Sequence, residues 1–367
     1  MKIIFITNLC PSYRLKPFQR LMELYDLDFY FYSRPDDAVA SHLEIIKNVD
    51  KLLYIPPWRI IMLLITGGHH ITIKCTNGRY ITILSFLIAK LLRKKFILWN
   101  TFWYTPQTLF RRLSIPILRW IWRYADAIVV YGEHGKRYLE SFGVNREKIF
   151  IAWQIIDNEV FSKKPLPEEL DAIRSRYNLD RKKIVLFVGR LIEEKGVSYL
   201  IQALKQLNDS NIALMIIGEG PLKAPLEKQC FDNNLKNALF MGHILSAELY
   251  KYYALADVFV LPSITTKDFK EPWGLVVNEA MNQGTPVVVT DAVGAGVGGL
   301  VEGGVNGFVV PERDSQSLSV ALYKILSDDA LRMSMRQNAR RIINDWTYER
   351  MVKGFTDAIE FVQGGIK

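Results

Sequence analysis

Two glutamates with a glycine between them are the first residues whose types and spacing suggest chemistry. Glu271 and Glu279 stand eight residues apart, after a strand-like run that ends at Leu261. The spacing places Glu271 in a loop and Glu279 about one turn into a helix. Gly274, at the helix start, lets a ligand approach backbone N–H groups, and the positive end of the helix favours an anion. Exposed glutamates are common, but a pair in this context predicts a binding site.

Two basic residues stand in another loop that follows an expected strand. Gly189 ends that strand, and Arg190 and Lys195 follow it beside the start of a helix. In parallel α/β sheets, ligands bind outside the carboxyl ends of the strands. Fixed cations beside a helix N-terminus are the ingredients of a diphosphate site there. The alternative, for this loop taken alone, is a solvated basic turn.

Two further turns follow strands in the same half of the chain. The turn Gly218–Pro221 is tight, with its proline suited to the first helical position, and on its own it indicates structure only. The turn made of Gly242, His243 and Ile244 follows a short strand and would offer backbone groups to a flat base. His243 by itself is typical of a surface histidine.

Two patterns match known motifs without the context that those motifs need. Residues 294–299 satisfy the dinucleotide-binding pattern G-x-G-x-x-G, which must open a helix, but three more glycines follow by residue 307. We therefore expect no dehydrogenase. Asp26 and Asp28 match a D-x-D metal motif, but they enter an apolar strand, where a polar start is ordinary. We predict no metal and no cofactor.

The elements that must position these residues alternate along the whole chain. The 367 residues, 49% hydrophobic and 23% charged, predict two globular domains. Short β-rich runs alternate with helix-length segments, which predicts an α/β fold with two doubly wound domains. The strands expected in the first half are 2–7, 28–32, 71–75, 96–99, 127–131 and 148–152. Those in the second half are 184–188, 212–217, 238–241, 258–261, 286–290 and 307–310.

A charged, proline-bearing stretch at residues 161–183 lacks apolar periodicity, which predicts the domain boundary there. We expect a first domain over 1–165 and a second over 172–345. A closing helix, at about 348–367, is long enough to leave its own domain and pack back onto the first. The apolar runs 60–66 and 81–92 are shorter than the roughly 20 residues of a membrane span, so we interpret both as buried helices.

The positive charge of the chain is concentrated in its first half. The net charge is +9, yet residues 1–165 hold 24 Lys and Arg against 13 Asp and Glu. Residues 51–125 hold 12 basic residues and no acidic one. This asymmetry predicts an anionic surface or ligand for the first half. The chain start lacks the features of a signal peptide, and the three cysteines form no CxxC pair, so we expect a cytoplasmic protein.

One basic segment also interleaves arginines with aromatic residues, which predicts a peripheral site on an anionic membrane surface. Arg112, Arg119 and Arg123 have helical spacing, although we expect Pro116 to kink or divide that helix. Basic and aromatic side chains both favour an anionic bilayer surface. The alternative is that Trp120 and Trp122 are core and the arginines solvated. Nucleic acid is not an expected partner, because no binding module accompanies the charge.

These motifs together resemble the retaining GT-B glycosyltransferases of family four, which move a sugar from a nucleotide donor. The resemblance covers nearly all of residues 184–350 and includes the Glu271-x7-Glu279 spacing. The other matching positions are 189–190, 195–196, 218–221, 256–257, 261–263, 284–288 and 306–308, with 125–130, 143–144 and 157–161 in the first half. The family implies two Rossmann-like domains that face each other across a cleft.

The resemblance also implies roles for single residues. Arg190 and Lys195 would hold the diphosphate of a UDP-sugar or GDP-sugar without a metal. Glu279 would accept hydrogen bonds from the ribose hydroxyls, and Glu271 would face the donor sugar. The remaining donor-binding positions are Gly189, Gly218, Gly242, His243, Ile244, Trp273, Gly274 and Leu275. Tyr13, Arg14 and Asn100 would lie on the acceptor side, and the acceptor would be a glycan or a lipid-linked molecule.

Two positions depart from the family pattern. Residues 8–14 replace a double glycine and resemble a branch with Pro, Tyr and Arg there. Asn100 stands where many members have a histidine and cannot act as a base, which is consistent with front-face transfer in which the leaving phosphate takes the proton. The alternatives are an idle sugar-nucleotide-binding or scaffold protein of the same fold and a nucleotide-sugar epimerase. The first should have lost a site residue, and the second should need acid/base groups that the sequence does not show.

Overall fold

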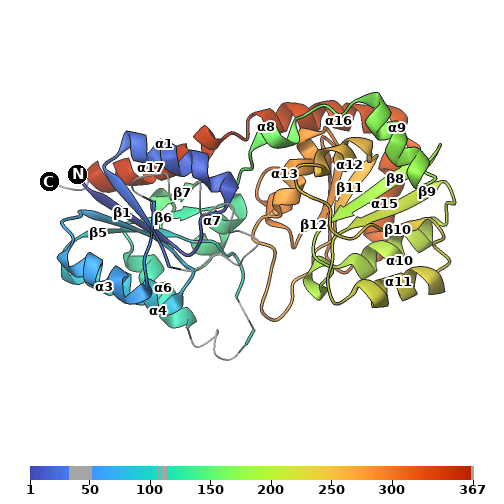
Figure 1. Cartoon of the computed structure of the whole chain (residues 1–367). Coiled ribbons are helices and arrows are strands. Elements are labelled where there is room, and N and C mark those ends of the chain that lie inside the picture. The colour runs from blue at the N-terminus through green and yellow to red at the C-terminus, as the bar shows by residue number, and fades with distance from the viewer. Residues whose placement is uncertain (33–51, 106, 109–113, 365–367) are drawn as a thin grey trace. The chain divides into compact units, whose positions relative to one another are not determined.

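The computed structural model describes residues 1–32, 52–105, 107–108 and 114–364, which form two compact units (Figure 1). The first unit is Met1–Ile155 together with the helix that begins at Tyr348, and the second is Ile156–Thr347. The chain therefore enters the second unit before the stretch 161–183 in which the sequence predicts the boundary. The short helix α8 (Asn158–Phe161) accounts for the difference, because Asn158 Nδ2 donates to Trp346 O at 3.2 Å.

A parallel sheet of seven strands forms the centre of the first unit, in the order β3-β2-β1-β4-β5-β6-β7. The strands are β1 (Ile3–Thr7), β2 (Leu27–Phe31), β3 (Leu52–Tyr54), β4 (Ile71–Cys75), β5 (Lys95–Trp99), β6 (Ala127–Val130) and β7 (Ile149–Ile151). Every expected strand is present, with ends that differ by at most one residue. Strand β3 was not expected from the sequence, because three residues are too few to carry a strand pattern.

Alternate residues of β1 show how helices cover the two faces of this sheet. Phe5 packs against Phe18 and Phe355, at ring-centroid distances of 5.4 and 5.3 Å. These partners lie on α1 (Leu15–Leu24) and α17 (Tyr348–Gly364), which run side by side on one face (Figure 1). Ile4 and Ile6 point the other way and pack against α3 (Pro57–Thr66). The closing helix α17 is thus part of the first unit.

A parallel sheet of six strands forms the centre of the second unit, in the order β10-β9-β8-β11-β12-β13. The strands are β8 (Lys183–Val188), β9 (Ile212–Ile217), β10 (Ala238–Phe240), β11 (Val258–Leu261), β12 (Val287–Thr290) and β13 (Gly307–Val310). The helices are α9 (Pro167–Arg176), α10 (Val197–Leu207), α11 (Lys223–Asp232), α12 (Leu249–Leu255), α13 (Leu275–Asn282), α14 (Gly294–Val297), α15 (Ser315–Ser327) and α16 (Asp329–Asn344). Because all strands are parallel, the loops after them meet at one edge.

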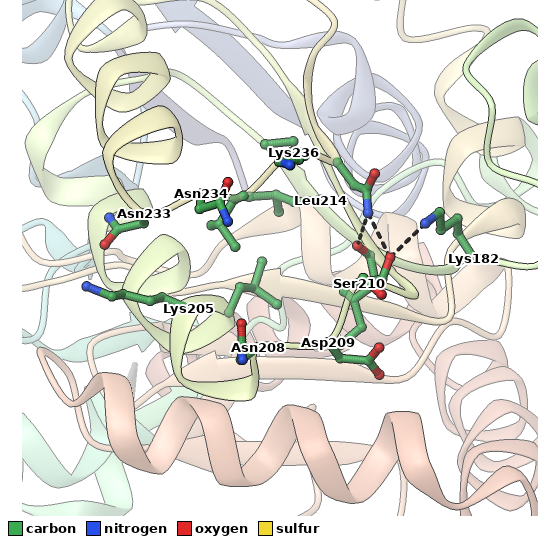
Figure 2. Close-up of a pocket in the computed structure, with 14 residues that line it drawn as sticks. Lys182, Lys205, Asn208, Asp209, Ser210, Leu214, Asn233, Asn234 and Lys236 are labelled. Atoms are coloured by element: carbon green, nitrogen blue, oxygen red, sulfur yellow. Dashed lines mark hydrogen bonds between the residues drawn. The ribbon is translucent and has the colours of Figure 1, made fainter.

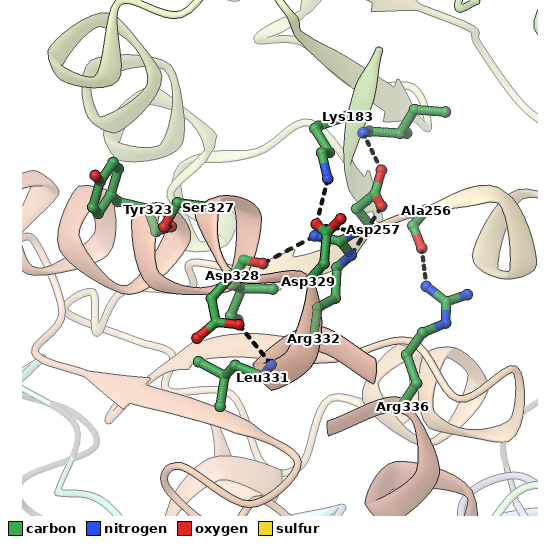
Figure 3. Close-up of polar contacts among 12 residues, drawn as sticks. Lys183, Ala256, Asp257, Tyr323, Ser327, Asp328, Asp329, Leu331, Arg332 and Arg336 are labelled. Atoms are coloured by element: carbon green, nitrogen blue, oxygen red, sulfur yellow. Dashed lines mark hydrogen bonds and ion pairs between the residues drawn. The ribbon is translucent and has the colours of Figure 1, made fainter. Parts of the chain in front are cut away.

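An aspartate before β11 links neighbouring elements at the amino edge of the second sheet, opposite the carboxyl edge. Asp257 accepts the backbone N–H of Ile184 at 2.8 Å and pairs with Arg332 Nε at 3.2 Å. Arg332 and Lys183 both reach Asp329, so β8, β11 and α16 share one ionic network (Figure 3). In the first unit, Asp126 accepts the N–H of Phe96 at 2.8 Å in the same way. Both aspartates hold the start of a neighbouring strand.

The apolar segments 60–66 and 81–92 form helices, but the expectation that both are buried is wrong. Helices α3 and α4 (Arg79–Leu91) bury one side each and expose Trp58 and Leu91, for example. Pro116 does not divide a helix, because it lies in the first turn of α6 (Ile115–Tyr124). Arg112 lies outside the described residues. In the described ranges, no helix combines the length and the apolar character needed to cross a membrane.

Candidate functional site

The loops after β8 and β11 are in close contact at the carboxyl edge of the second sheet. Gly196 adopts φ 64° and caps α10, and a Cβ on it would lie 2.0 Å from the carbonyl oxygen of Pro262. Only glycine fits this backbone and this contact. Ile264 N–H also donates to Glu194 O at 2.9 Å. These contacts set Lys195, one residue before the glycine, against the loop that carries Glu271.

Lys195 and Glu271 meet at this contact. Lys195 Nζ donates to Glu271 Oε2, and the two side chains are 13% and 10% exposed. Ser263 Oγ donates to the same oxygen at 3.5 Å. Glu271 also forms a bridge with Val293, beyond the end of β12, so its backbone is held on both sides. The predicted phosphate-binding cation and the predicted sugar-facing carboxylate therefore form one ion pair.

The backbone conformation and the packing at the start of α13 require a glycine. Gly274 caps the helix with φ 91°, and a Cβ there would lie 2.7 Å from Leu261 Cδ2. Trp273 is buried, and its Nε1 donates to Asn278 Oδ1 at 2.8 Å, which anchors the entry to the helix. The first N–H groups of a helix have no intrahelical partner, and Leu275 is the first residue of α13. An anion is favoured at this helix end.

Glu279 lies on α13 and has a partner that the sequence analysis missed. Tyr253, fully buried on α12, donates its hydroxyl to Glu279 Oε2 at 2.7 Å. Burial raises the pKa of the Glu279 carboxyl to about 7, although the tyrosine hydrogen bond lowers it. Because Tyr253 lies 26 residues before Glu279, no local pattern in the sequence indicates that the two side chains pair. The carboxyl can thus exist in either protonation state near neutral pH.

The three expected glycine turns lie next to one another along the carboxyl edge. Gly189 N–H donates to Ile217 O at 2.9 Å, and Gly218 N–H donates to Gly242 O at 2.8 Å. Arg190 and His243 are exposed beside these turns, and Ile244 is half-buried. The structure therefore brings the residues after β8, β9 and β10 to the same edge as the Lys195–Glu271 pair. The exposure of the His243 side chain is what a surface histidine would show.

A tether that the sequence analysis missed fixes the loop before Glu271. Thr265 donates its N–H and its hydroxyl to Glu312, the hydroxyl at 2.6 Å. Arg313 Nη2 donates to Thr265 O at 2.5 Å. Both partners follow β13, so the loops after β11 and β13 are joined. The sequence offered one indication of this contact, because Glu312 and Arg313 closely follow the predicted strand 307–310.

The acceptor-side residues predicted in the first unit have a buried arginine among them. Arg14 Nη2 donates to Tyr131 OH at 3.0 Å, and its guanidinium lies over the ring of Trp99, 4.5 Å from the centroid. The ring of Tyr13 is 5.4 Å from the same guanidinium. Asn100 is buried and donates to Phe102 O at 2.6 Å. Tyr13 and Arg14 thus adjoin each other, and the hydrogen bond of the Asn100 side chain goes to Phe102 instead.

A cavity of about 370 Å³ in the second unit lies at the amino edge of the sheet, opposite the edge that carries Lys195 and Glu271. Residues before the strands, such as Lys182 and Ser210, line it together with residues of α10 and β9 (Figure 2). Asn237, before β10, is also part of the lining. Lys182 Nζ and Asn237 Nδ2 donate to Ser210 O, at 2.7 and 2.8 Å, so these groups serve the turn before β9. Ligands of parallel α/β sheets bind at the carboxyl ends, which favours the Lys195–Glu271 edge.

The two patterns set aside in the sequence analysis have structural roles. Residues 294–297 form α14, a single turn that is too short for the dinucleotide motif. Asp28 lies within β2 and pairs with Lys2 at 3.1 Å. Over the described part of the chain, no group of three or more His, Cys, Asp or Glu side chains is arranged to hold a metal ion.

Several known proteins are similar in sequence to the chain. The profile of the family described as "Glycosyl transferases group 1" matches residues 170–342. The alpha-D-kanosaminyltransferase of Streptomyces kanamyceticus is 31% identical over 247 residues, 64% of this chain and 61% of that protein. A GDP-mannose-dependent alpha-(1-6)-phosphatidylinositol monomannoside mannosyltransferase of Mycolicibacterium smegmatis is 30% identical over 199 residues, 53% of this chain and 51% of that protein. The chain spans about half to three fifths of the length of such curated relatives.

The fold is shared with solved structures along almost the whole chain. The crystal structure of Anabaena Alr3699/HepE in complex with UDP has a TM-score of 0.77 and 18% identity, over 98% of this chain and all of that one. This likeness identifies the GT-B fold, which has two Rossmann-like units. Residues 170–342 are therefore similar to the glycosyl transferases group 1 family, in a chain with the GT-B fold.

Proposed function

We propose that this protein is a retaining glycosyltransferase that moves a sugar from a nucleoside-diphosphate sugar to an acceptor. The observation that carries the proposal is the Lys195–Glu271 pair, held at the carboxyl edge of the second sheet beside the start of α13. This edge offers a cation and a helix N-terminus for a diphosphate and a carboxylate for sugar hydroxyls. The nucleoside diphosphate of the donor is UDP or GDP: a structural neighbour binds UDP, and a relative is named for GDP-mannose.

In this proposal, positive charge drives departure of the diphosphate. Lys195 and Arg190 neutralise the negative charge that develops on the leaving group, and the N–H groups of Gly274 and Leu275 add to this effect. A bound diphosphate takes Lys195 as its partner and releases Glu271 Oε2 for a hydroxyl of the donor sugar. Because two side-chain cations supply the charge, we propose that transfer needs no added metal.

Glu279 and Asn100 have separate roles in the proposal. Tyr253 occupies Glu279 Oε2, which leaves the second carboxyl oxygen for the ribose hydroxyls. Asn100 stands after β5 and has no basic group. The bond from the anomeric carbon to the diphosphate oxygen breaks, and the acceptor oxygen bonds to that carbon on the same face, which retains the anomeric configuration. The leaving diphosphate takes the acceptor proton.

The acceptor in this proposal is a lipid-linked or envelope glycan, bound through the first unit near Tyr13 and Arg14. The support is the charge distribution, with 12 basic and no acidic residues over 51–125. A relative named for a phosphatidylinositol-based acceptor is consistent with it. The protein would work in the cytoplasm, peripherally at the inner face of the membrane.

A thermal-shift panel with UDP, GDP and their sugars tests the donor site. A ligand at about 100 times its Kd stabilises the folded protein by roughly 2.7 kcal/mol. We expect UDP or GDP to raise the Tm of the wild type and to have a smaller effect on Lys195→Ala. If no nucleotide stabilises the wild type, the proposed donor site is wrong. Stabilisation without sugar transfer to any glycan or lipid acceptor would favour the idle binding protein instead.

A further inference from the structure

The outer surfaces of three helices in the first unit are apolar. Of the 22 exposed large hydrophobic side chains in the described residues, 11 lie between Trp58 and Tyr124. Ten of them recur at intervals of three or four residues along each helix, so each helix presents one stripe to solvent. The stripes are Trp58, Met62 and Ile65 on α3; Tyr80, Leu84, Leu87 and Leu91 on α4; and Ile117, Trp120 and Tyr124 on α6.

The three stripes belong to one layer of the first unit, which we call the α3/α4/α6 face. Helix α4 contacts both α3 and α6 (Figure 1). Trp120 packs edge-on against Phe86 of α4, with ring centroids 4.9 Å apart. Apolar patches of this kind mark interaction sites on folded proteins. The face needs a partner that accepts many apolar side chains at once.

The charged residues around this face identify the partner. Arg59, Arg93, Arg119 and Arg123 are exposed on these helices or at their ends. Residues 51–125 contain no acidic side chain to balance them. A second copy of the chain would bring like charges together, and nucleic acid would not use the apolar stripes. An anionic bilayer offers negative headgroups for the arginines and an apolar interior for the stripes.

We propose that the α3/α4/α6 face docks onto an anionic lipid bilayer and inserts its apolar stripes into the interface. This inference rests on the proposed membrane-linked function and names the surface that performs it. Trp58, Trp120 and Tyr124 lie at the headgroup level, where amphipathic rings are favoured. The arginines contact lipid phosphates. The docking is thus both electrostatic and hydrophobic, and each part can be removed separately.

The test is co-sedimentation of the full chain with phosphatidylcholine vesicles, with and without phosphatidylglycerol. We expect salt-sensitive binding that needs the anionic lipid. The charge variant Arg59→Glu, Arg93→Glu, Arg123→Glu should bind about 100-fold more weakly, because each basic residue contributes roughly fivefold. Its matched control, Lys205→Glu, Lys228→Glu, Lys236→Glu, reverses the same number of charges in the second unit and should bind like the wild type.

A second pair of variants tests insertion. Trp58→Ser, Leu91→Ser, Tyr124→Ser removes one exposed side chain from each stripe and should lower binding at least about tenfold, even at low salt. The control Phe231→Ser, Tyr323→Ser, Met333→Ser removes equally exposed side chains from the second unit and should have no effect. Tryptophan quenching by lipids labelled at shallow depth should fall in Trp58→Phe.

The outcomes separate this inference from the proposed function. No vesicle binding by the wild type at low salt, or equal losses in the variants and their controls, would overturn it. Binding by the serine variant equal to that of the wild type would overturn insertion and leave electrostatic attraction alone. Each protein is also tested for stabilisation by UDP and GDP. Nucleotide binding without vesicle binding refutes the docking face only, whereas vesicle binding without nucleotide binding refutes the proposed donor site only.

Discussion

A hydrogen bond from Lys195 Nζ to Glu271 Oε2 links two residues that are 76 positions apart in the sequence. The pair is close to buried, so each group compensates the charge of the other in a region that water enters poorly. Removing one partner of such a pair leaves an uncompensated charge. The two residues therefore have to be tested separately, because their variants should affect different steps.

Replacing Lys195 should weaken donor binding. In the proposed donor site, Lys195→Ala would remove one charge-assisted hydrogen bond to the diphosphate, for which about 1.5–3 kcal/mol, or roughly 10- to 100-fold in Kd, is typical. Isothermal titration with the nucleotide that stabilises the wild type measures this change. Lys228→Ala, which removes an exposed lysine of the same unit, is the control and should keep the wild-type Kd. An unchanged Kd in Lys195→Ala would refute the diphosphate role.

Replacing Glu271 should have the opposite effect on nucleotide binding. Glu271→Gln removes the carboxylate that competes for Lys195, so the free nucleotide should bind as tightly as to the wild type or more tightly. Transfer should slow by about 100-fold, because the carboxylate no longer holds the donor sugar in the transition state. Titration and single-turnover kinetics separate the two effects. A nucleotide affinity as low as that of Lys195→Ala would contradict the separate roles.

The raised pKa of Glu279 makes stability depend on pH in a defined direction. Burial raises the pKa of this carboxyl from 4.5 to about 7, so the native state keeps a proton that the unfolded chain has lost. Stability therefore falls as pH rises from about 4.5 to about 7 and then levels off. Glu279→Gln can still accept from Tyr253 and avoids this loss, so it should be more stable than the wild type by about 3 kcal/mol at about pH 8. The difference should vanish at about pH 4.

Denaturant unfolding at both pH values measures the Glu279 effect, and nucleotide titration supplies the functional readout. The same variant should bind nucleotide more weakly, because the amide is a poorer acceptor for two ribose hydroxyls. Equal nucleotide affinity would remove the ribose role. A stability gain of the same size at both pH values would remove the protonation argument.

Asp257 should matter for stability rather than for the donor site. Asp257→Asn loses the ion pair with Arg332 and weakens the bond to Ile184 N–H, at a cost of about 2 kcal/mol in the free energy of unfolding. Asp329→Asn changes the exposed member of the same network and should cost less than about 0.5 kcal/mol. Urea unfolding measures both. A nucleotide Kd that changes in Asp257→Asn at low temperature would argue against a purely structural role.

The strands were predictable from the sequence because both faces of each parallel sheet are covered, so each strand is a continuous apolar run such as Ile184–Val188. The apolar runs of α3 and α4 look the same in sequence, although one side of each helix is exposed. The composition of a segment shows that it is apolar but does not show whether another element packs over it. The exposed α3/α4/α6 face therefore could not be predicted from the sequence.

The site was predictable where its residues belong to one contiguous motif, as for Glu271, Gly274 and Glu279. It was not predictable where partners come from distant parts of the chain. Tyr253 reaches Glu279 from another helix, and Glu312, which follows β13, reaches Thr265, which follows β11, past the strand β12. These contacts depend on how the elements pack, which a single sequence does not record.

The position of α17 sets the order in which the chain can mature during synthesis. Phe355 packs against Phe5 and Trp99, and a Cβ on Gly354 would lie 2.1 Å from Ile151 O, so α17 fits tightly into the first unit. At roughly 5–20 residues per second, a ribosome needs tens of seconds to reach this helix after making β1. The unit that is translated first is thus completed last, and its aromatic core waits while the second unit folds.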